Sequence, residues 1–186
     1  MANAPISHRM TAFISGHIDL SQADFDTIYI PLIASGLSQG HHFILGDAAG
    51  VDSQALTYLI SESTQEAHPD IVSRITIYPS RPYNISKLTH LGLTIVAPDD
   101  PTLATTPDVE AIIGVAKGGK DKARFKHLVR DTHMTLNSDY DILYVRSEEE
   151  SKVLYGAAYR PRVSATELNR MRREKVLKHV GTRTVD

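Results

Sequence analysis

The chain has 186 residues and a formal net charge of −2, with 41% hydrophobic and 23% charged residues. This composition gives no sign of disorder and does not call for a nucleic-acid partner, and the length suffices for one domain with a substantial core. The absence of cysteine excludes disulfides, zinc–thiolate sites and thiol nucleophiles. Because residues 1–10 lack the apolar core of a signal peptide and no apolar run approaches membrane-spanning length, we expect a cytoplasmic protein without a membrane partner.

The first half of the chain alternates short apolar runs with amphipathic segments. An apolar run over 11–15 predicts the first strand, and Ser21 with Asp24 resembles a capping box at the start of a helix. Apolar residues at helical spacing continue this helix to Gly36, and Pro31 within it predicts a kink or a break. The next predicted elements are a strand over 42–45, a helix over 51–60, and strands over 74–78 and 93–97.

The second half begins with an interruption. Residues 98–122 are rich in proline, glycine and threonine, and we interpret them as a lid or an oligomer contact. The remaining predicted elements are a helix over 125–132, a strand over 140–145, a helix that begins at Ser164 or Thr166, and a loose tail over 181–186. Strands that alternate with helices predict that residues 1–186 form a single domain. Its expected fold is a Rossmann-like three-layer α/β sandwich with a mainly parallel sheet of about five strands.

The stretch from Phe43 to Leu56 predicts a buried strand, a turn of small residues and the first turns of a helix. Small residues at such a turn let a ligand approach the backbone, and the amides of the new helix favour an anion, usually a phosphate. The residues expected to cradle it are Gly46, Asp47, Ala48, Ala49, Gly50 and Val51, followed by Asp52 in the first helical turn. The alternative is an ordinary βα turn in which the glycines only relieve strain.

Polar residues also follow the first predicted strand. Ser15 is a candidate donor to a phosphate, Gly16 follows it, and His17 is a candidate contact to phosphate or base. The alternative is that Ser15 and His17 satisfy backbone groups of the turn. Because ligands of open parallel sheets bind beyond the carboxyl ends of the strands, we expect these residues to share a crevice with the 46–52 turn.

Two later segments offer further candidates. Arg130 and Met134 share one helix face and are both candidate ligand contacts, Arg130 as a bidentate donor to a phosphate or carboxylate. The alternative is a solvated basic face. Thr166 is expected to cap the last helix or to bind a phosphate. Glu167 and Asn169 are candidates for contacts to ribose hydroxyls.

The order and spacing of these pieces resemble the SLOG superfamily, which includes the Lonely Guy phosphoribohydrolases, the DNA-processing protein A family and small nucleotide-binding relatives. Residues 46–55 are similar to the pattern Gly-x-Ala-x-Gly-[Ile/Val]-Asp-x-x-Ala of the DNA-processing branch, and residues 13–20 resemble the opening of the small relatives. Residues 130–139 resemble the Arg-Lys-x-x-Met…Ser-Asp stretch of Lonely Guy proteins. In the phosphoribohydrolases an arginine and a glutamate attend cleavage of the N-glycosidic bond; the resemblance places the arginine at Arg130 and the glutamate position at Asn169, with Glu167 two residues earlier. The resemblance also implies that the protein forms a homo-oligomer.

Three functions remain open on the sequence. The leading hypothesis is that the chain binds a nucleotide or a nucleotide-derived small molecule. The second is an N-glycosidase, of the phosphoribohydrolase or deoxyribosyltransferase kind, with Glu167 as the main carboxylate and Asp52 or Asp139 in reserve. The third is a DNA-associated module that uses the basic helix 168–178, ranked last because the net charge is negative. No cofactor is expected, and the nine histidines show no metal-ligand spacing.

Overall fold

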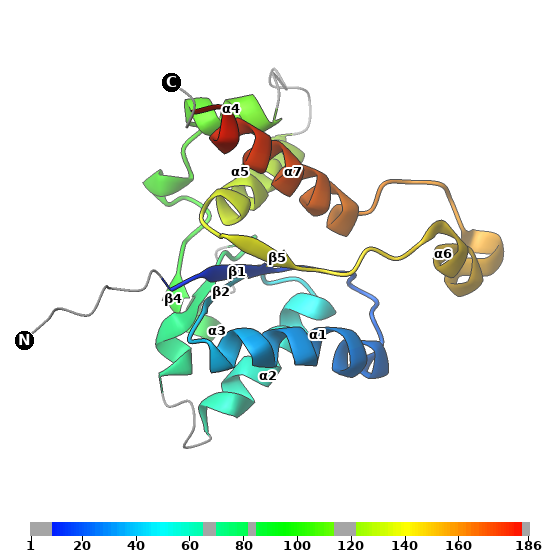
Figure 1. Ribbon diagram of the computed structural model, residues 1–186, viewed down its shortest axis with the longest axis horizontal. Coiled ribbons are helices and arrows are strands. Elements are labelled where there is room, and N and C mark those ends of the chain that lie inside the picture. Colours follow the sequence, from blue (N-terminus) through cyan, green and yellow to red (C-terminus); the bar gives the residue numbers. More distant parts are fainter. Residues whose placement is uncertain (1–8, 65–69, 82–84, 114–121, 184–186) are drawn as a thin grey trace, which may run out of the picture.

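The computed structural model of the chain describes residues 9–64, 70–81, 85–113 and 122–183. Within these residues, five parallel strands form one sheet in the order β4-β3-β2-β1-β5 (Figure 1). The strands are β1 (Thr11–Ile14), β2 (His42–Leu45), β3 (Ile75–Ile77), β4 (Thr94–Ile95) and β5 (Tyr140–Ile142). Helices cover both faces, which confirms the predicted three-layer α/β fold. Four of the strands are shorter than predicted, because the outer residues of their predicted runs lie in adjoining loops or, for Arg74, in a 3₁₀ turn.

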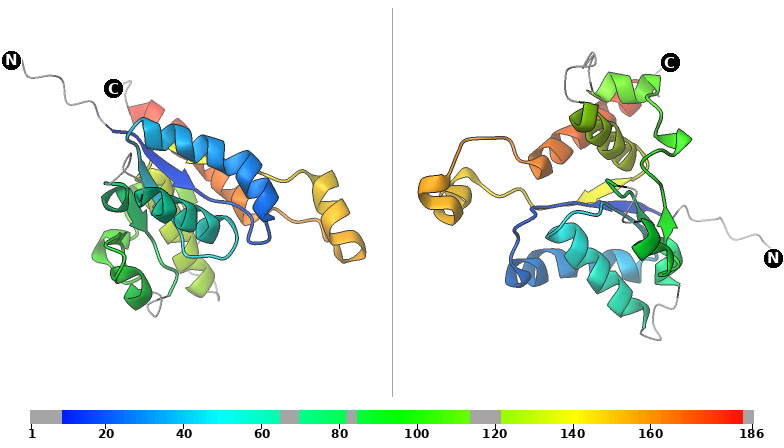
Figure 2. Two further views of the ribbon diagram at one scale, coloured as in Figure 1. Left: turned by 90° about the horizontal axis from the view of Figure 1, so that it is seen from below. Right: turned by 180° about the vertical axis from the view of Figure 1, so that it is seen from behind.

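The helices divide between the two faces of the sheet. Three lie on one face, namely α1 (Gln22–Ser38), α2 (Val51–Ser63) and α3 (Ile85–Thr89). The opposite face carries α4 (Pro107–Ile113), α5 (Lys122–Leu136) and α7 (Ala165–Arg183). The short helix α6 (Glu148–Tyr155) projects beyond the carboxyl ends of the strands (Figure 2). No helix among the described residues has the length and apolarity needed to cross a bilayer.

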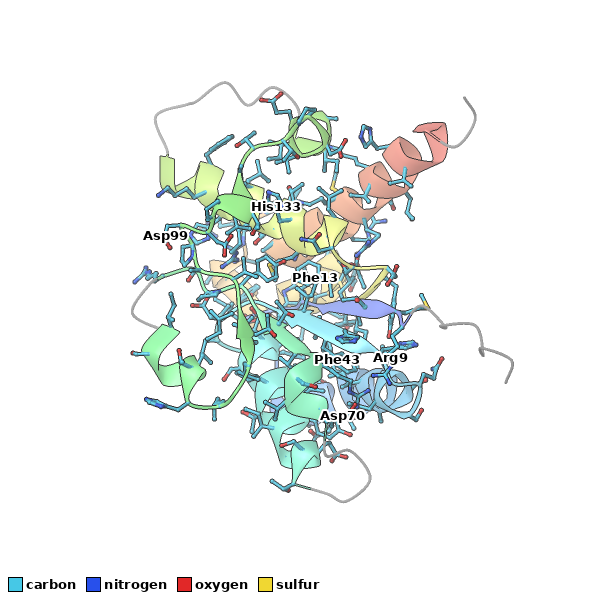
Figure 3. The ribbon with its side chains drawn as sticks, turned by 90° about the vertical axis from the view of Figure 1, so that its left-hand side faces the viewer. Arg9, Phe13, Phe43, Asp70, Asp99 and His133 are labelled. Carbon is cyan, nitrogen blue, oxygen red and sulfur yellow. The ribbon has the colours of Figure 1, made fainter. Side chains whose placement is uncertain are left out.

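Side chains that alternate along the strands build a core on each face. On the α1/α2 face, Phe43 packs with the buried Phe25 and Tyr29 of α1, and on the other face Phe13 packs with Met134 of α5. Figure 3 labels Phe13 and Phe43 on opposite sides of the sheet. Met134, predicted as a ligand contact beside Arg130, is thus fully buried in the core.

Helix α1 begins as predicted but ends later. The Asp24 amide donates to the Ser21 side chain over 3.1 Å, which confirms Ser21 as the helix cap. The helix runs through Pro31, whose ring lies on the exposed face, so the predicted break is absent. Gly36, predicted as the stop, lies inside the helix, where an added Cβ would come within 3.0 Å of the Tyr140 hydroxyl. The glycine therefore serves close packing of α1 against the sheet.

Two segments contain more helix than the sequence predicts, which in the first of them is one short helical turn near Ile112. Part of the 98–122 segment forms a 3₁₀ turn over 101–103 and helix α4, whose Val109 and Ile112 are buried where α4 packs against α5 and α7. The described part of this segment therefore belongs to one layer of the fold, and residues 114–121 lie outside the described residues. Helix α7 continues to Arg183, so the predicted tail is helical over 181–183, and residues 184–186 lie outside the described residues.

Candidate functional site

The order in which strands are added to the sheet reverses at β1. Strands β2, β3 and β4 extend to one side of β1, whereas β5 pairs with its other side. The carboxyl ends of β2, β1 and β5 are therefore neighbours. In open α/β sheets this reversal point is where a crevice forms and ligands bind.

Tyr29 ties the ends of β1 and β5 together. Its hydroxyl donates to the Ser15 carbonyl over 3.0 Å and accepts the Tyr144 amide over 2.9 Å. Burial raises the pKa of Tyr29 to about 12, so the hydroxyl keeps its proton in neutral solution. An added Cβ on Gly16 would collide with Val51 and lie 2.5 Å from this hydroxyl. The turn after β1 thus rests directly on the start of α2.

The predicted phosphate cradle is partly occupied by the protein itself. The Val51 amide donates to the His17 carbonyl over 3.3 Å, and the Ala48 amide donates to the Asp52 carboxylate over 3.2 Å. An added Cβ on Gly46 would collide with that same carboxylate. At these positions the small residues serve close packing within the chain.

The Asp52 carboxyl group predicts a specific pH dependence. Burial raises its pKa to about 7, above the value of 3.8 for an exposed aspartate. The folded state therefore holds a proton that the unfolded state releases, and stability falls as the pH rises through this interval. We expect Asp52→Asn to stabilise the fold by about 2 kcal/mol more at about pH 8 than at about pH 5, because asparagine removes the ionisation that destabilises the folded state. This difference is smaller than the full pKa shift would give, because Asp52 keeps part of its surface exposed to solvent. Urea unfolding at both pH values measures this, and an equal effect at both would show that the carboxyl ionises normally.

A polar cavity of about 380 Å³ lies at the carboxyl ends of β1 and β5. We call it the β1/β5 cavity. Its walls come from the turn after β1, the end of β5, helix α6 and the start of α7. The residues that matter for its chemistry are His17, Arg146, Tyr155, Tyr159, Arg160, Arg162 and Glu167.

The β1/β5 cavity holds arginine charge that its own carboxylates do not balance, because its two glutamates, Glu148 and Glu167, pair with Lys152 and Arg170. Arg146 is balanced by Asp19, 3.2 Å away, and Asp19 also accepts the Tyr155 hydroxyl over 2.5 Å. Arg160 donates only to backbone carbonyls, and neither Arg160 nor Arg162 forms an ion pair with any residue in the described part of the chain. Two guanidinium groups without a carboxylate partner make this cavity suited to an anion.

His17 lines this cavity as a neutral side chain. Its Nε2 atom accepts the Arg146 amide over 3.2 Å, which fixes the ring beside the end of β5. Burial, followed by the nearby Arg146 charge, lowers the pKa of His17 below 6.5. The imidazole is therefore uncharged in neutral solution, and its remaining N–H is a donor.

Helix α6, which supplies much of the wall, is absent from the elements predicted from the sequence. Its start is a capping box: the Glu150 amide donates to the Ser147 side chain over 3.1 Å, and the Ser147 amide donates to Glu150 over 2.7 Å. The spacing Ser-x-x-Glu is the signal that predicts such a helix start. This signal indicates an additional helix between β5 and α7, the segment that holds the cavity residues missing from the sequence prediction: Arg146, Tyr155, Tyr159, Arg160 and Arg162.

The predicted catalytic pair lines two different cavities. Arg130 lines a cavity of about 510 Å³ beside α5, which we call the α5 cavity, whereas Glu167 lines the β1/β5 cavity. Glu167 pairs with Arg170 over 2.7 Å, and this contact lowers the pKa of Glu167. Residues 46–49 and Asp52 line a third hollow of about 260 Å³. The structure thus distributes the predicted site residues over three hollows.

The remaining candidates are buried or engaged elsewhere. Ser164, and not Thr166, caps α7, because the Glu167 amide donates to the Ser164 side chain over 3.0 Å. Thr166 is buried, and the buried Asn169 side chain accepts a hydrogen bond from Arg172. The Ser15 hydroxyl is also buried and has no hydrogen-bond partner among the described residues.

Asp139, the alternative catalytic carboxylate, lies at the amino ends of the strands and not at the carboxyl ends where the three hollows lie. It directly precedes β5 and accepts the Thr11 amide over 2.7 Å, at the amino ends of the strands. Its carboxylate therefore secures the start of β1 and lies away from the carboxyl ends.

Most arginines of α7 are buried or paired with carboxylates within the fold. Arg172 and Arg173 are buried, and Arg173 pairs with Asp141 over 2.6 Å. Arg170 is held by Glu167 and Glu174. Arg172 and Arg173 therefore face the interior of the fold, and the arrangement lends no support to a DNA-associated module.

Comparison with family models, with curated proteins and with solved structures finds no match to this chain. The resemblance to the SLOG superfamily therefore stays a prediction that rests on the motifs.

Proposed function

We propose that this protein binds a nucleotide or a nucleotide-derived small molecule in the β1/β5 cavity. The single observation that carries the proposal is the presence of two arginines without carboxylate partners, Arg160 and Arg162, in a cavity at the point where the strand order reverses. Arginine matches phosphate geometry with paired N–H donors, and the reversal point of an open sheet is a common place for nucleotides.

The other walls suit the rest of such a ligand. Tyr155 and Tyr159 offer ring faces for a base, and the neutral His17 offers a hydrogen-bond donor. The cavity volume of about 380 Å³ lies within the range of small-molecule sites. The phosphate is thus assigned to the arginines, and the 46–52 turn has no direct role in this proposal.

The proposal predicts a selective loss of phosphate recognition in one variant. We expect Arg162→Ala to weaken binding of AMP about tenfold, because a charge-assisted hydrogen bond is lost, and to leave the weaker binding of adenosine unchanged. Isothermal titration calorimetry with AMP, GMP, CMP, UMP and ADP-ribose identifies the preferred base and measures the loss.

Arg9→Ala is the matched control. Arg9 precedes β1 at the amino ends of the strands, whereas the cavity lies at the carboxyl ends. Arg9 is largely exposed beside Asp70, so its loss removes one positive charge far from the cavity. Equal weakening by both substitutions would reduce the effect to net charge. If no nucleotide of the panel binds below about 1 mM, the proposal fails.

A second candidate function is cleavage of the base–ribose bond in the same cavity. The observation in its favour is Glu167, which lines the cavity and is kept ionised by Arg170, since an ionised carboxylate stabilises an oxocarbenium-like state. Incubation with nucleoside monophosphates should then release free base. Glu167→Gln should abolish release while AMP still binds, whereas binding without release identifies a binding protein.

A further inference from the structure

The α5 cavity has chemistry that the proposed nucleotide site does not use. It lies beside α5 at the carboxyl ends of β3 and β4 and has a volume of about 510 Å³. Much of its wall is apolar and includes Pro79, Pro98 and Phe125. Its charged residues are all basic, since the described lining holds no aspartate or glutamate. Small-molecule sites typically combine such an apolar wall with a few placed polar groups.

Arg130 presents a preorganised donor to this cavity. Its Nε and Nη2 atoms donate to one oxygen of Asp131 over 3.0 and 2.8 Å. The nearly buried Asp47 accepts the Ser80 amide over 2.8 Å and lies 3.7 Å from Nη1 of Arg130. That last distance is too long for a hydrogen bond, and Nη1 makes none with any residue that the structure describes. Asp131 thus holds the guanidinium in orientation while Nη1 keeps donors for a ligand.

A second cation lies on the same face of α5. Lys126 precedes Arg130 by four residues, so the two side chains are neighbours on the helix. Lys126 is exposed and makes no ion pair within the described residues, and the half-buried Phe125 lines the same cavity. An anion between these two cations would have an aromatic ring beside it.

We propose that the α5 cavity binds a small aromatic carboxylate, with its ring against Phe125 and the prolines and its carboxylate between Lys126 and Arg130. A ring gains most from an apolar wall of this kind, because flat aromatic groups bury a large area at little cost in conformational entropy. Asp47 and Asp131 lie beside Arg130 and reduce the local positive charge. The site therefore favours a singly charged anion over a phosphate dianion, which separates it from the β1/β5 cavity.

Three probes separate the contributions of ring and charge: naphthoate, the neutral naphthalenemethanol, and acetate. We expect naphthoate to bind saturably and about tenfold more tightly than naphthalenemethanol, with no saturable binding of acetate. Amide chemical shifts in a protein NMR titration should move at Ser80 and Val129, which line the cavity or its rim. Equal affinity of the acid and the alcohol, or shifts confined to other parts of the protein, would overturn the proposal.

Lys126→Ala tests the cation directly, and because Lys126 is exposed the variant should fold. We expect it to weaken naphthoate binding about fivefold and to leave naphthalenemethanol unchanged. Lys152→Ala removes an exposed lysine from α6 and serves as the control without effect. Equal naphthoate affinities of the two variants would contradict the assignment. AMP should not displace naphthoate, so this site can be supported or rejected whether or not the β1/β5 cavity binds nucleotides.

Discussion

Replacement of Arg173 by methionine is expected to lower the free energy of unfolding by about 3 kcal/mol, because it leaves the nearly buried Asp141 carboxylate without its ion-pair partner. Two guanidinium nitrogens of Arg173 donate to one oxygen of Asp141 in β5, over 3.1 and 2.6 Å. The same guanidinium donates to the carbonyls of Thr135 and Ser138, over 2.9 and 2.6 Å. One side chain of α7 thus secures both the last turn of α5 and the edge strand of the sheet.

Urea-induced unfolding measures this loss, and an unchanged dependence on urea concentration would show that only stability has changed. Arg170→Met on the same helix is the control, because Arg170 and Glu174 are exposed and Glu167 is partly exposed, so solvent screens both pairs. We expect the control to change stability by no more than about 0.5 kcal/mol. Equal effects of the two substitutions would mean that solvent screens the Arg173 pair as well.

Replacement of Gly50 by alanine should cost about 3 kcal/mol or more, since it adds a steric clash to backbone strain. Gly50 precedes α2 with φ 71° and ψ −128°, a conformation that side chains other than glycine rarely adopt. An added Cβ would also collide with the backbone of His17 and Ile18. Because both obstacles are backbone atoms, neither can move aside without opening the contact between the first two turns of the fold.

Gly156 provides a control that separates the clash from the strain. It adopts φ 52° and ψ −128° after α6, and an added Cβ there would meet nothing within 4 Å. Gly156→Ala should therefore cost only the strain, about 1 to 2 kcal/mol. The difference between the two variants in thermal unfolding measures the clash, and the absence of a difference would contradict the close contact between residues 17–18 and Gly50.

Local sequence patterns predict the elements of this fold well where neighbouring residues alone determine the secondary structure. Alternation of apolar strands with amphipathic helices predicts the parallel sheet, and Ser21 predicts the start of α1. Gly36 shows the limit of such reasoning. A glycine near a helix end resembles a stop, yet its contact is with Tyr140, a residue about a hundred positions away. Short-range patterns hold no information about that partner.

The candidate site shows the same division. Local pattern alone predicts the strand, turn and helix start over residues 43–56, because small residues between a buried strand and an amphipathic helix favour this arrangement. Contacts between distant segments place the His17 carbonyl on the Val51 amide, and they place Arg130 and Glu167 in different cavities. The uncompensated Arg160 and Arg162 at the β1/β5 reversal are likewise a tertiary feature. Hydrogen bonds and charge balance depend on which distant residues the strand order brings together, and no local spacing specifies that order.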